Sequence, residues 1–131
     1  MKKVLPVAAA LAIIFLIAGC AEDSKEEMSY RKVSPEEAKK LMETEKDYVV
    51  LDVRTEKEFL NDHLPDAILI PDYDIEQKAE SLLTDKNQLI MVYCRSGNRS
   101  YKASQKLVDL GYTNIKDLGG IKEWPYETVG E

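Results

Sequence analysis

The sequence predicts one α/β domain with a mostly parallel central sheet and helices on both faces. Two observations favour this class. Short, nearly continuous apolar runs at 48–53 and 89–93 are typical of strands buried on both faces. Helix-compatible stretches alternate with such runs, which favours parallel strands joined by helical crossovers. A chain of 131 residues has room for one such domain and a short appendage.

The first expected element of the domain is a helix at residues 35–44. Ser34 is placed to cap it, Pro35 takes the first helical position, and Glu37 occupies the capping-box position three residues after the cap. Apolar residues then follow at helical spacing. The ordered domain should therefore begin near Tyr30.

The later elements alternate between strand and helix. A third strand is expected at 67–70, where Pro71 ends the apolar pattern, and a short fourth strand near Ile115. Gly111 supplies a left-handed position that ends the last helix. The expected helices lie at 56–61, 75–83 and 99–110.

The N-terminus has the order of a secretory signal, in which basic residues precede an apolar run. The run ends in I-A-G-C at 17–20, which resembles the bacterial lipobox, whose cysteine is lipidated and becomes the first residue. We therefore expect a lipoprotein signal peptide at 1–20, an acidic tether at 21–29 and a domain at 30–131. Cys20 would hold the protein on an extracytoplasmic membrane surface. The alternative is an uncleaved anchor helix, because the apolar stretch reaches the lower limit for spanning a bilayer.

Charge and cysteine content narrow the chemistry. The chain has 18 basic and 24 acidic residues, and this acidic balance disfavours nucleic acid as a partner. Residues 94–106 reverse this acidic balance, because they include four basic residues and no Asp or Glu. Such a segment favours an anionic ligand or a stabilised thiolate, although a solvated helix face explains its two lysines equally well. With Cys20 used by the anchor, Cys94 is a free thiol. An exposed thiol outside the cytoplasm is an oxidation liability, which favours a chemical use; an inert core cysteine is the alternative.

Cys94 stands where an open α/β sheet binds ligands, at the carboxyl end of a strand and before a helix. A turn containing Gly97 can aim backbone N–H groups inward as an anion-binding nest. These donors, the helix terminus, Arg95 and Arg99 all favour the thiolate, which is the nucleophile. Its attack on the outer sulfur of a donor such as thiosulfate would leave a persulfide on Cys94.

Several segments resemble the rhodanese family. They are L-D-V-R at 51–54, E-F-x-x-x-H-L-P-x-A at 58–67, V-Y-C-R-S-G-N-R-S at 92–100, L-G-Y-x-N-I at 110–115 and L-G-G-I-x-x-W at 118–124. The resemblance runs from about Tyr30 to Tyr126. It implies a small α/β sulfurtransferase with Cys94 as nucleophile and a loop that cradles the sulfur, formed by Arg95, Ser96, Gly97, Asn98 and Arg99.

The resemblance also implies the partners. We expect a small anionic sulfur donor, a thiol or cyanide acceptor, a membrane contact through the lipid on Cys20, no nucleic acid and no cofactor, in a protein that acts as a monomer. The sole histidine, His63, supports neither a metal site nor a Cys–His pair. The family commonly reads G-H-I-P-G-A where this chain has aspartates at 62 and 66, and aspartate tolerates a positive φ better than most side chains.

Three further residues can support the Cys94 site, and each rival function requires a different sequence at the loop. Arg99 is favoured as an anion clamp over an ordinary first-turn residue. Asp52 and Arg54 can border the same crevice, although a buried aspartate that caps the next helix is the simpler interpretation. A phosphatase or arsenate reductase on the same fold needs C-x-x-x-x-x-R, but position 100 is serine. A non-catalytic envelope binding module has no need of Cys94, and a thioredoxin-like enzyme would need C-x-x-C.

Overall fold

The computed structural model describes residues 29–130. The expected signal peptide, Cys20 and nearly all of the expected tether lie outside the described residues. Five parallel strands form one sheet in the order β1-β5-β4-β2-β3. The strands are β1 (Tyr30–Lys32), β2 (Tyr48–Asp52), β3 (Ile68–Leu69), β4 (Leu89–Cys94) and β5 (Ile115–Gly120). The helices are α2 (Pro35–Thr44), α3 (Glu56–Asn61), α4 (Ile75–Leu82) and α5 (Asn98–Asp109), with short 3-10 turns η1 (Asp72–Asp74) and η2 (Ile121–Glu123).

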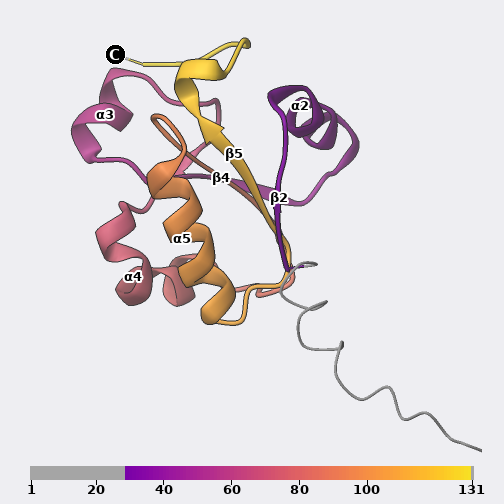
Figure 1. Ribbon diagram of the computed structural model, residues 1–131, viewed down its shortest axis with the longest axis vertical. Helices are drawn as coiled ribbons and strands as arrows, with labels where there is room; N and C mark the ends of the chain where they lie inside the picture. The colour runs from indigo at the N-terminus through magenta and orange to yellow at the C-terminus, as the bar shows by residue number, and fades with distance from the viewer. Residues whose placement is uncertain (1–28, 131) are drawn as a thin grey trace, which may run out of the picture.

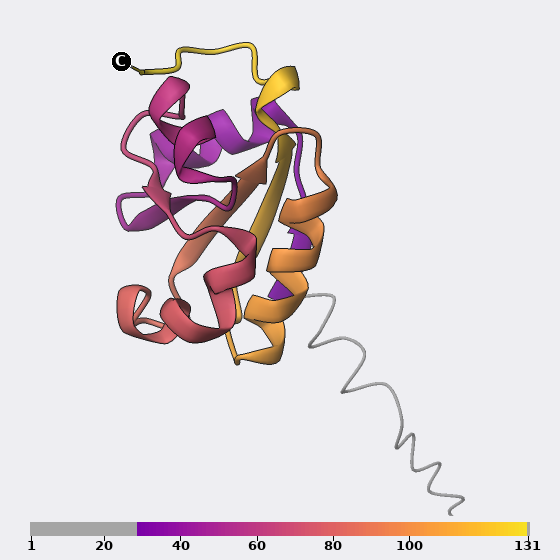
Figure 2. The same ribbon diagram turned by 90° about the vertical axis from the view of Figure 1, so that its left-hand side faces the viewer.

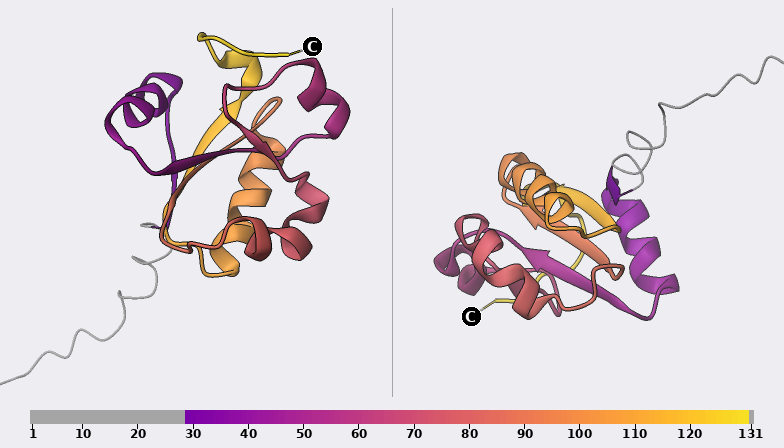
Figure 3. Two further views of the ribbon diagram at one scale, coloured as in Figure 1. Left: turned by 180° about the vertical axis from the view of Figure 1, so that it is seen from behind. Right: turned by 90° about the horizontal axis from the view of Figure 1, so that it is seen from below.

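Helices cover both faces of the sheet, which confirms the predicted class. α4 and α5 lie on one face and α2 on the other (Figures 1 and 3). Alternate residues of β4 supply the two cores: Ile90 and Val92 pack with the α4 and α5 side, whereas Met91 and Tyr93 pack with the α2 side. Cys94 continues the first series, so its side chain belongs to the core beneath α5.

The sheet has one more strand than the sequence predicts. β1 was not expected, because two of its three residues are charged and carry no apolar alternation. It pairs with β5 at the edge of the sheet, with Tyr30 opposite Ile115. β5 itself runs six residues, to Gly120, rather than forming a short strand near Ile115. Pairing with β4, which places Tyr93 opposite Gly119 and Cys94 opposite Gly120, extends the strand through glycines that are poor strand formers.

The helix starts agree closely with expectation, but the two caps differ. At α2 the Ser34 hydroxyl accepts the Glu37 N–H at 3.1 Å, while the Glu37 carboxylate pairs with Arg31 at 2.6 Å and forms no reciprocal capping bond. At α3, Thr55 and Glu58 form the complete reciprocal box. Both helices therefore begin where their polar residues can satisfy free backbone N–H groups.

The parallel strands place all their carboxyl ends at one edge of the sheet. The end of β4 and the end of β5 meet there, with Cys94 opposite Gly120. Tyr30, at the start of β1, lies at the opposite end, where the amino ends of the strands are. After η2 the chain turns back across the carboxyl edge, where Val129 and His63 exchange two backbone hydrogen bonds of 2.8 Å (Figure 2). Within residues 29–130, no helix has the length and apolar character needed to cross a bilayer.

Candidate active site

The Cys94 loop connects β4 to α5 in three residues. Gly97 adopts a left-handed φ of 109° and caps α5, which begins at Asn98. This turn directs the Gly97 N–H toward Cys94, whose Sγ accepts it at 3.0 Å. The buried Ser100 hydroxyl donates to the Gly97 carbonyl at 3.1 Å and fixes the turn from inside. The loop thus places a sulfur atom at the N-terminal end of a helix of 12 residues.

The expectation of an exposed thiol was wrong. Cys94 is 1% exposed and packs into the core beneath α5, because its side chain points to the helix face of β4. The sulfur thus belongs to the apolar cluster beneath α5 and also accepts a backbone hydrogen bond. The next residues, Arg95 and Ser96, are exposed. The thiol therefore lies at the floor of a loop whose rim is open to solvent.

A glycine pair at the end of β5 supports the loop from one side. A Cβ on Gly120 would lie 2.3 Å from the Arg95 carbonyl oxygen and 2.8 Å from the Ser96 Cα, closer than atoms can approach. Gly120 has an extended backbone, so this requirement is steric rather than conformational. Gly119 adds a left-handed turn at φ 79°. The loop can pack directly on this strand end only because position 120 has no side chain.

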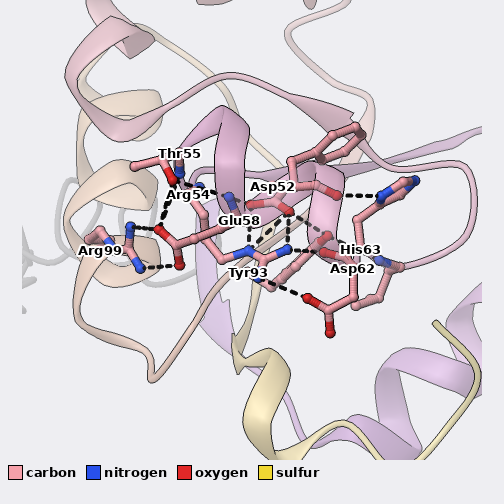
Figure 4. Close-up of polar contacts among 10 residues, drawn as sticks. Asp52, Arg54, Thr55, Glu58, Asp62, His63, Tyr93 and Arg99 are labelled. Carbon is pink, nitrogen blue, oxygen red and sulfur yellow. Dashed lines mark hydrogen bonds and ion pairs between the residues drawn. The ribbon is translucent and has the colours of Figure 1, made fainter. Parts of the chain in front are cut away.

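An ion pair supports the loop from the other side. Both guanidinium nitrogens at the end of Arg99 donate to the carboxylate of Glu58, at 2.8 and 3.0 Å (Figure 4). These hydrogen bonds lower the pKa of Glu58 to about 2, although partial burial opposes the shift. Hydrogen bonding by Glu58 likewise raises the pKa of Arg99. Arg99, expected as an anion clamp, is thus paired with the carboxylate of Glu58. Glu58 was not selected from the sequence as a site residue. The T-x-x-E capping pattern at 55–58 was the one sequence feature that marked this glutamate.

Arg54 lines a cleft beside the Cys94 loop, whereas Asp52 is buried and does not line that cleft. The expected helix-capping role of Asp52 was wrong. Thr55 caps α3, while the Asp52 carboxylate accepts bonds from the Arg54 backbone N–H at 2.9 Å and from its Nη2 at 2.8 Å. The Tyr93 hydroxyl donates to Asp52 at 2.7 Å (Figure 4). The same hydroxyl accepts the Leu64 N–H at 3.1 Å. Asp52 raises the pKa of Arg54 although burial alone would lower it, and burial together with Asp52 raises the pKa of Tyr93.

The comparisons with known proteins agree with this geometry. The Rhodanese-like domain model matches residues 34–127. The chain belongs to the rhodanese-like domain family. It is 33% identical over 73 residues to the thiosulfate sulfurtransferase PspE of Escherichia coli, a match that covers 56% of this chain and 70% of PspE. It is 35% identical over 100 residues to the adenylyltransferase and sulfurtransferase UBA4 of Candida albicans, covering 71% of this chain but 23% of that protein. A solved structure described as a rhodanese with anions from E. coli aligns with a TM-score of 0.61 at 30% identity and covers 64% of this chain and 99% of that one.

The two aspartates that replace family glycines have different consequences in this rhodanese-like domain. Asp66 adopts φ 62°, the sole positive φ of a non-glycine residue between 29 and 130. Asp62 is extended, at φ −161°, and needs no such tolerance. Its carbonyl accepts a bond from Arg54, and its carboxylate lies 3.6 Å from the same guanidinium. His63 is a structural histidine: its ring stacks on Phe59 with centroids 3.9 Å apart, and Nδ1 lies 2.8 Å from the Phe59 carbonyl.

A cleft of about 650 Å³ opens beside the Cys94 loop of this rhodanese-like domain. Three elements supply its walls: α3 with the segments around it, the loop itself through Arg95, and the turn after β5. The lining residues are Arg54, Lys57, Glu58, Leu60, Asn61, Asp62, Arg95, Ile121 and Lys122. Across the described part of the chain, no cluster of three or more His, Cys, Asp and Glu is arranged to hold a metal ion.

Proposed function

We propose that the protein is a sulfurtransferase in which Cys94 carries one sulfane sulfur as a persulfide. The Cys94 thiolate attacks the outer sulfur of thiosulfate, a Cys–S–S bond forms, and the S–S bond of thiosulfate breaks with its electron pair leaving on sulfite. A thiolate or cyanide then attacks the outer sulfur, and the Cys94 thiolate departs with the pair. Each half-reaction conserves charge and needs no oxidant, reductant or cofactor.

One observation carries this proposal: the N–H of Gly97, the N-cap residue of α5, donates to Cys94 Sγ at 3.0 Å. A hydrogen bond and a helix N-terminus both stabilise negative charge on sulfur, which the nucleophile and the persulfide each carry. The shortness of the loop supports sulfur as the cargo. Only three residues separate the cysteine from α5, which leaves room for a single atom above Sγ better than for a tetrahedral oxyanion.

The rival phosphatase and arsenate reductase functions gain no support from the loop. The arginine that such a loop places six positions after the cysteine is replaced by Ser100, which is fully buried and bonded to the Gly97 carbonyl. Arg99 is held by Glu58. A non-catalytic module would not need a hydrogen bond that stabilises negative charge on the Cys94 sulfur. Two relatives that match this chain, PspE and UBA4, carry the name of a sulfurtransferase, which supports the same conclusion.

The decisive experiment is intact-mass measurement after exposure to thiosulfate. We expect the protein to gain the mass of one sulfur atom, cyanide to remove it as thiocyanate, and Cys94→Ser to gain nothing. Serine is the closest replacement in size and preserves the packing beneath α5. Unchanged mass in the native protein, together with hydrolysis of an aryl phosphate, would overturn the proposal in favour of a phosphatase.

We also propose that Cys20 is lipidated and that the protein acts as a monomer at an extracytoplasmic membrane surface. The I-A-G-C sequence after an apolar run supports the anchor. Mass spectrometry of the mature protein should find a diacylglycerol-modified Cys20 at the N-terminus, and Cys20→Ala should remain unprocessed. An unmodified Met1 in the membrane fraction would instead indicate a helical anchor.

A further inference from the structure

The cleft beside the Cys94 loop has an unbalanced positive charge that the sulfur-carrying loop does not explain. Its acidic side chains are already paired: Glu58 with Arg99, and Asp62 with the Arg54 guanidinium. Arg54 also pairs with the buried Asp52, so this group of one guanidinium and two carboxylates keeps one negative charge. Within residues 29–130 three further lining cations, Lys57, Arg95 and Lys122, have no carboxylate partner. In a chain of net charge −6, these three cations outweigh the one negative charge left on the Arg54 group, and this excess points to an anionic ligand.

The size of the cleft identifies which reactant it suits. Small-molecule sites occupy roughly 300–1,000 Å³, and this cleft of about 650 Å³ is much larger than a thiosulfate ion needs. Leu60, which is 45% exposed, and Ile121 add an apolar wall that can contact a carbon skeleton. A ligand with both carbon and several negative charges fits these walls better than a bare inorganic anion.

Resting on the proposed function, we propose that this cleft binds the sulfur acceptor, and that the acceptor is a small organic thiol carrying more than one carboxylate. Lys57 and Lys122 hold its carboxylates from opposite walls, and Arg95 guides its sulfur to the loop. The acceptor thiolate attacks the outer sulfur of the Cys94 persulfide. The S–S bond breaks, the Cys94 thiolate leaves with the electron pair, and the acceptor departs as its own persulfide.

The test measures discharge of protein loaded with thiosulfate and then freed of excess donor. Loss of the added sulfur mass is followed in time with three probes: mercaptosuccinate, neutral 2-mercaptoethanol and cationic cysteamine. The double variant Lys57→Gln/Lys122→Gln is compared with the native protein. Because each probe is compared between proteins, differences in thiol nucleophilicity cancel.

We expect the second-order rate constant with mercaptosuccinate to fall about tenfold in the double variant, roughly threefold for each exposed charge removed. The ratio of the rate constant with mercaptosuccinate to that with 2-mercaptoethanol should fall by the same factor. In the native protein this ratio should also become smaller at high ionic strength. Lys40→Gln/Lys46→Gln is the matched control, because it removes two exposed charges from the α2 side and should leave all three rates unchanged.

Two failures remain distinguishable. If thiosulfate loads no sulfur, the proposed function itself fails. If sulfur loads normally but all three probes respond alike to Lys57→Gln/Lys122→Gln, the acceptor assignment is wrong while the sulfurtransferase remains. Slower loading by thiosulfate with unchanged discharge would likewise overturn it, because the cleft would then serve the donor.

Discussion

The Cys94 loop is supported from two sides by different physical means. On the β5 side, backbone packs on backbone at Gly120, where no atom can be added. On the α3 side, Arg99 and Glu58 meet through side chains that are 32% and 27% exposed. Steric contact does not depend on salt or pH, whereas a partly exposed ion pair is weakened by both. The first support should therefore fix where the loop lies, and the second should adjust its charge and stability.

The largest effect is expected from Gly120→Ala. The new methyl group overlaps the Arg95 carbonyl, so the loop must move away from β5 and carry the Gly97 N–H with it. We expect sulfur loading to fall by about a hundredfold, because small displacements of reacting groups have costs of this size. Overpacking should also reduce the free energy of unfolding by about 1–3 kcal/mol.

Gly111→Ala provides the control for that change. Gly111 has a left-handed φ of 98° but open space around it, and it lies at the far end of α5. Alanine there should lower stability by about 1 kcal/mol while sulfur loading stays normal. If Gly120→Ala loads sulfur as well as Gly111→Ala does, steric support by β5 is not what positions the loop.

A smaller effect is expected from Glu58→Gln, which keeps the shape of the side chain and removes its charge. Arg99 then loses a bidentate partner, so loading at saturating thiosulfate should slow by roughly tenfold. The half-saturating thiosulfate concentration should fall, because a negative charge beside the loop has gone. A purely structural role for Glu58 would lower the maximal rate without that fall. Loading measured by mass against thiosulfate concentration separates the two.

The same ion pair predicts the response of stability to acid. The pKa of Glu58 is lowered from 4.5 to about 2, so its contribution is complete above about pH 4.5 and is lost as the pH falls toward 2. For a partly exposed pair the loss should be about 0.5–1 kcal/mol. Urea unfolding at pH 7 and pH 3 should show this loss in the native protein and a smaller one in Glu58→Gln. Equal losses in both proteins would contradict the assignment.

The smallest effect is expected from Glu37→Gln, at the equivalent position of α2. Glu37 pairs with Arg31 of the edge strand β1, and no hydrogen bond or ion pair within residues 29–130 joins its carboxylate to the Cys94 loop. Sulfur loading should be unchanged, and thermal unfolding should report less than about 0.5 kcal/mol. A loss of activity comparable with that of Glu58→Gln would show that the motif acts through helix stability alone.

These two glutamates show what the sequence can and cannot predict. Both follow a capping Ser or Thr by three residues, and both helices begin where that pattern predicts. The pattern does not say that Glu58 meets Arg99, because the two lie 41 residues apart and are brought together only by parallel strands ending at one edge. Position in the fold, rather than the local motif, gives one glutamate access to the loop.

The buried strands and the place of Cys94 were predictable because each depends on a local pattern: apolar runs for β2 and β4, and a strand end followed by a helix for the loop. The edge strand β1 was not, since pairing with β5 rather than its own residues makes it a strand. The need for a glycine at position 120 was not predictable either, because it depends on a contact between segments that are distant in the sequence. The positive φ tolerated at Asp66 was anticipated from its side chain.

The direction of the sheet has a consequence for a tethered protein. The domain begins at the edge where β1 starts, while the Cys94 loop and its cleft occupy the edge where the strands finish. If Cys20 carries the proposed lipid, the anchored segment would therefore enter the domain at the end of the sheet opposite the Cys94 loop. The anchor and the sulfur-bearing loop would then not compete for the same end of the fold.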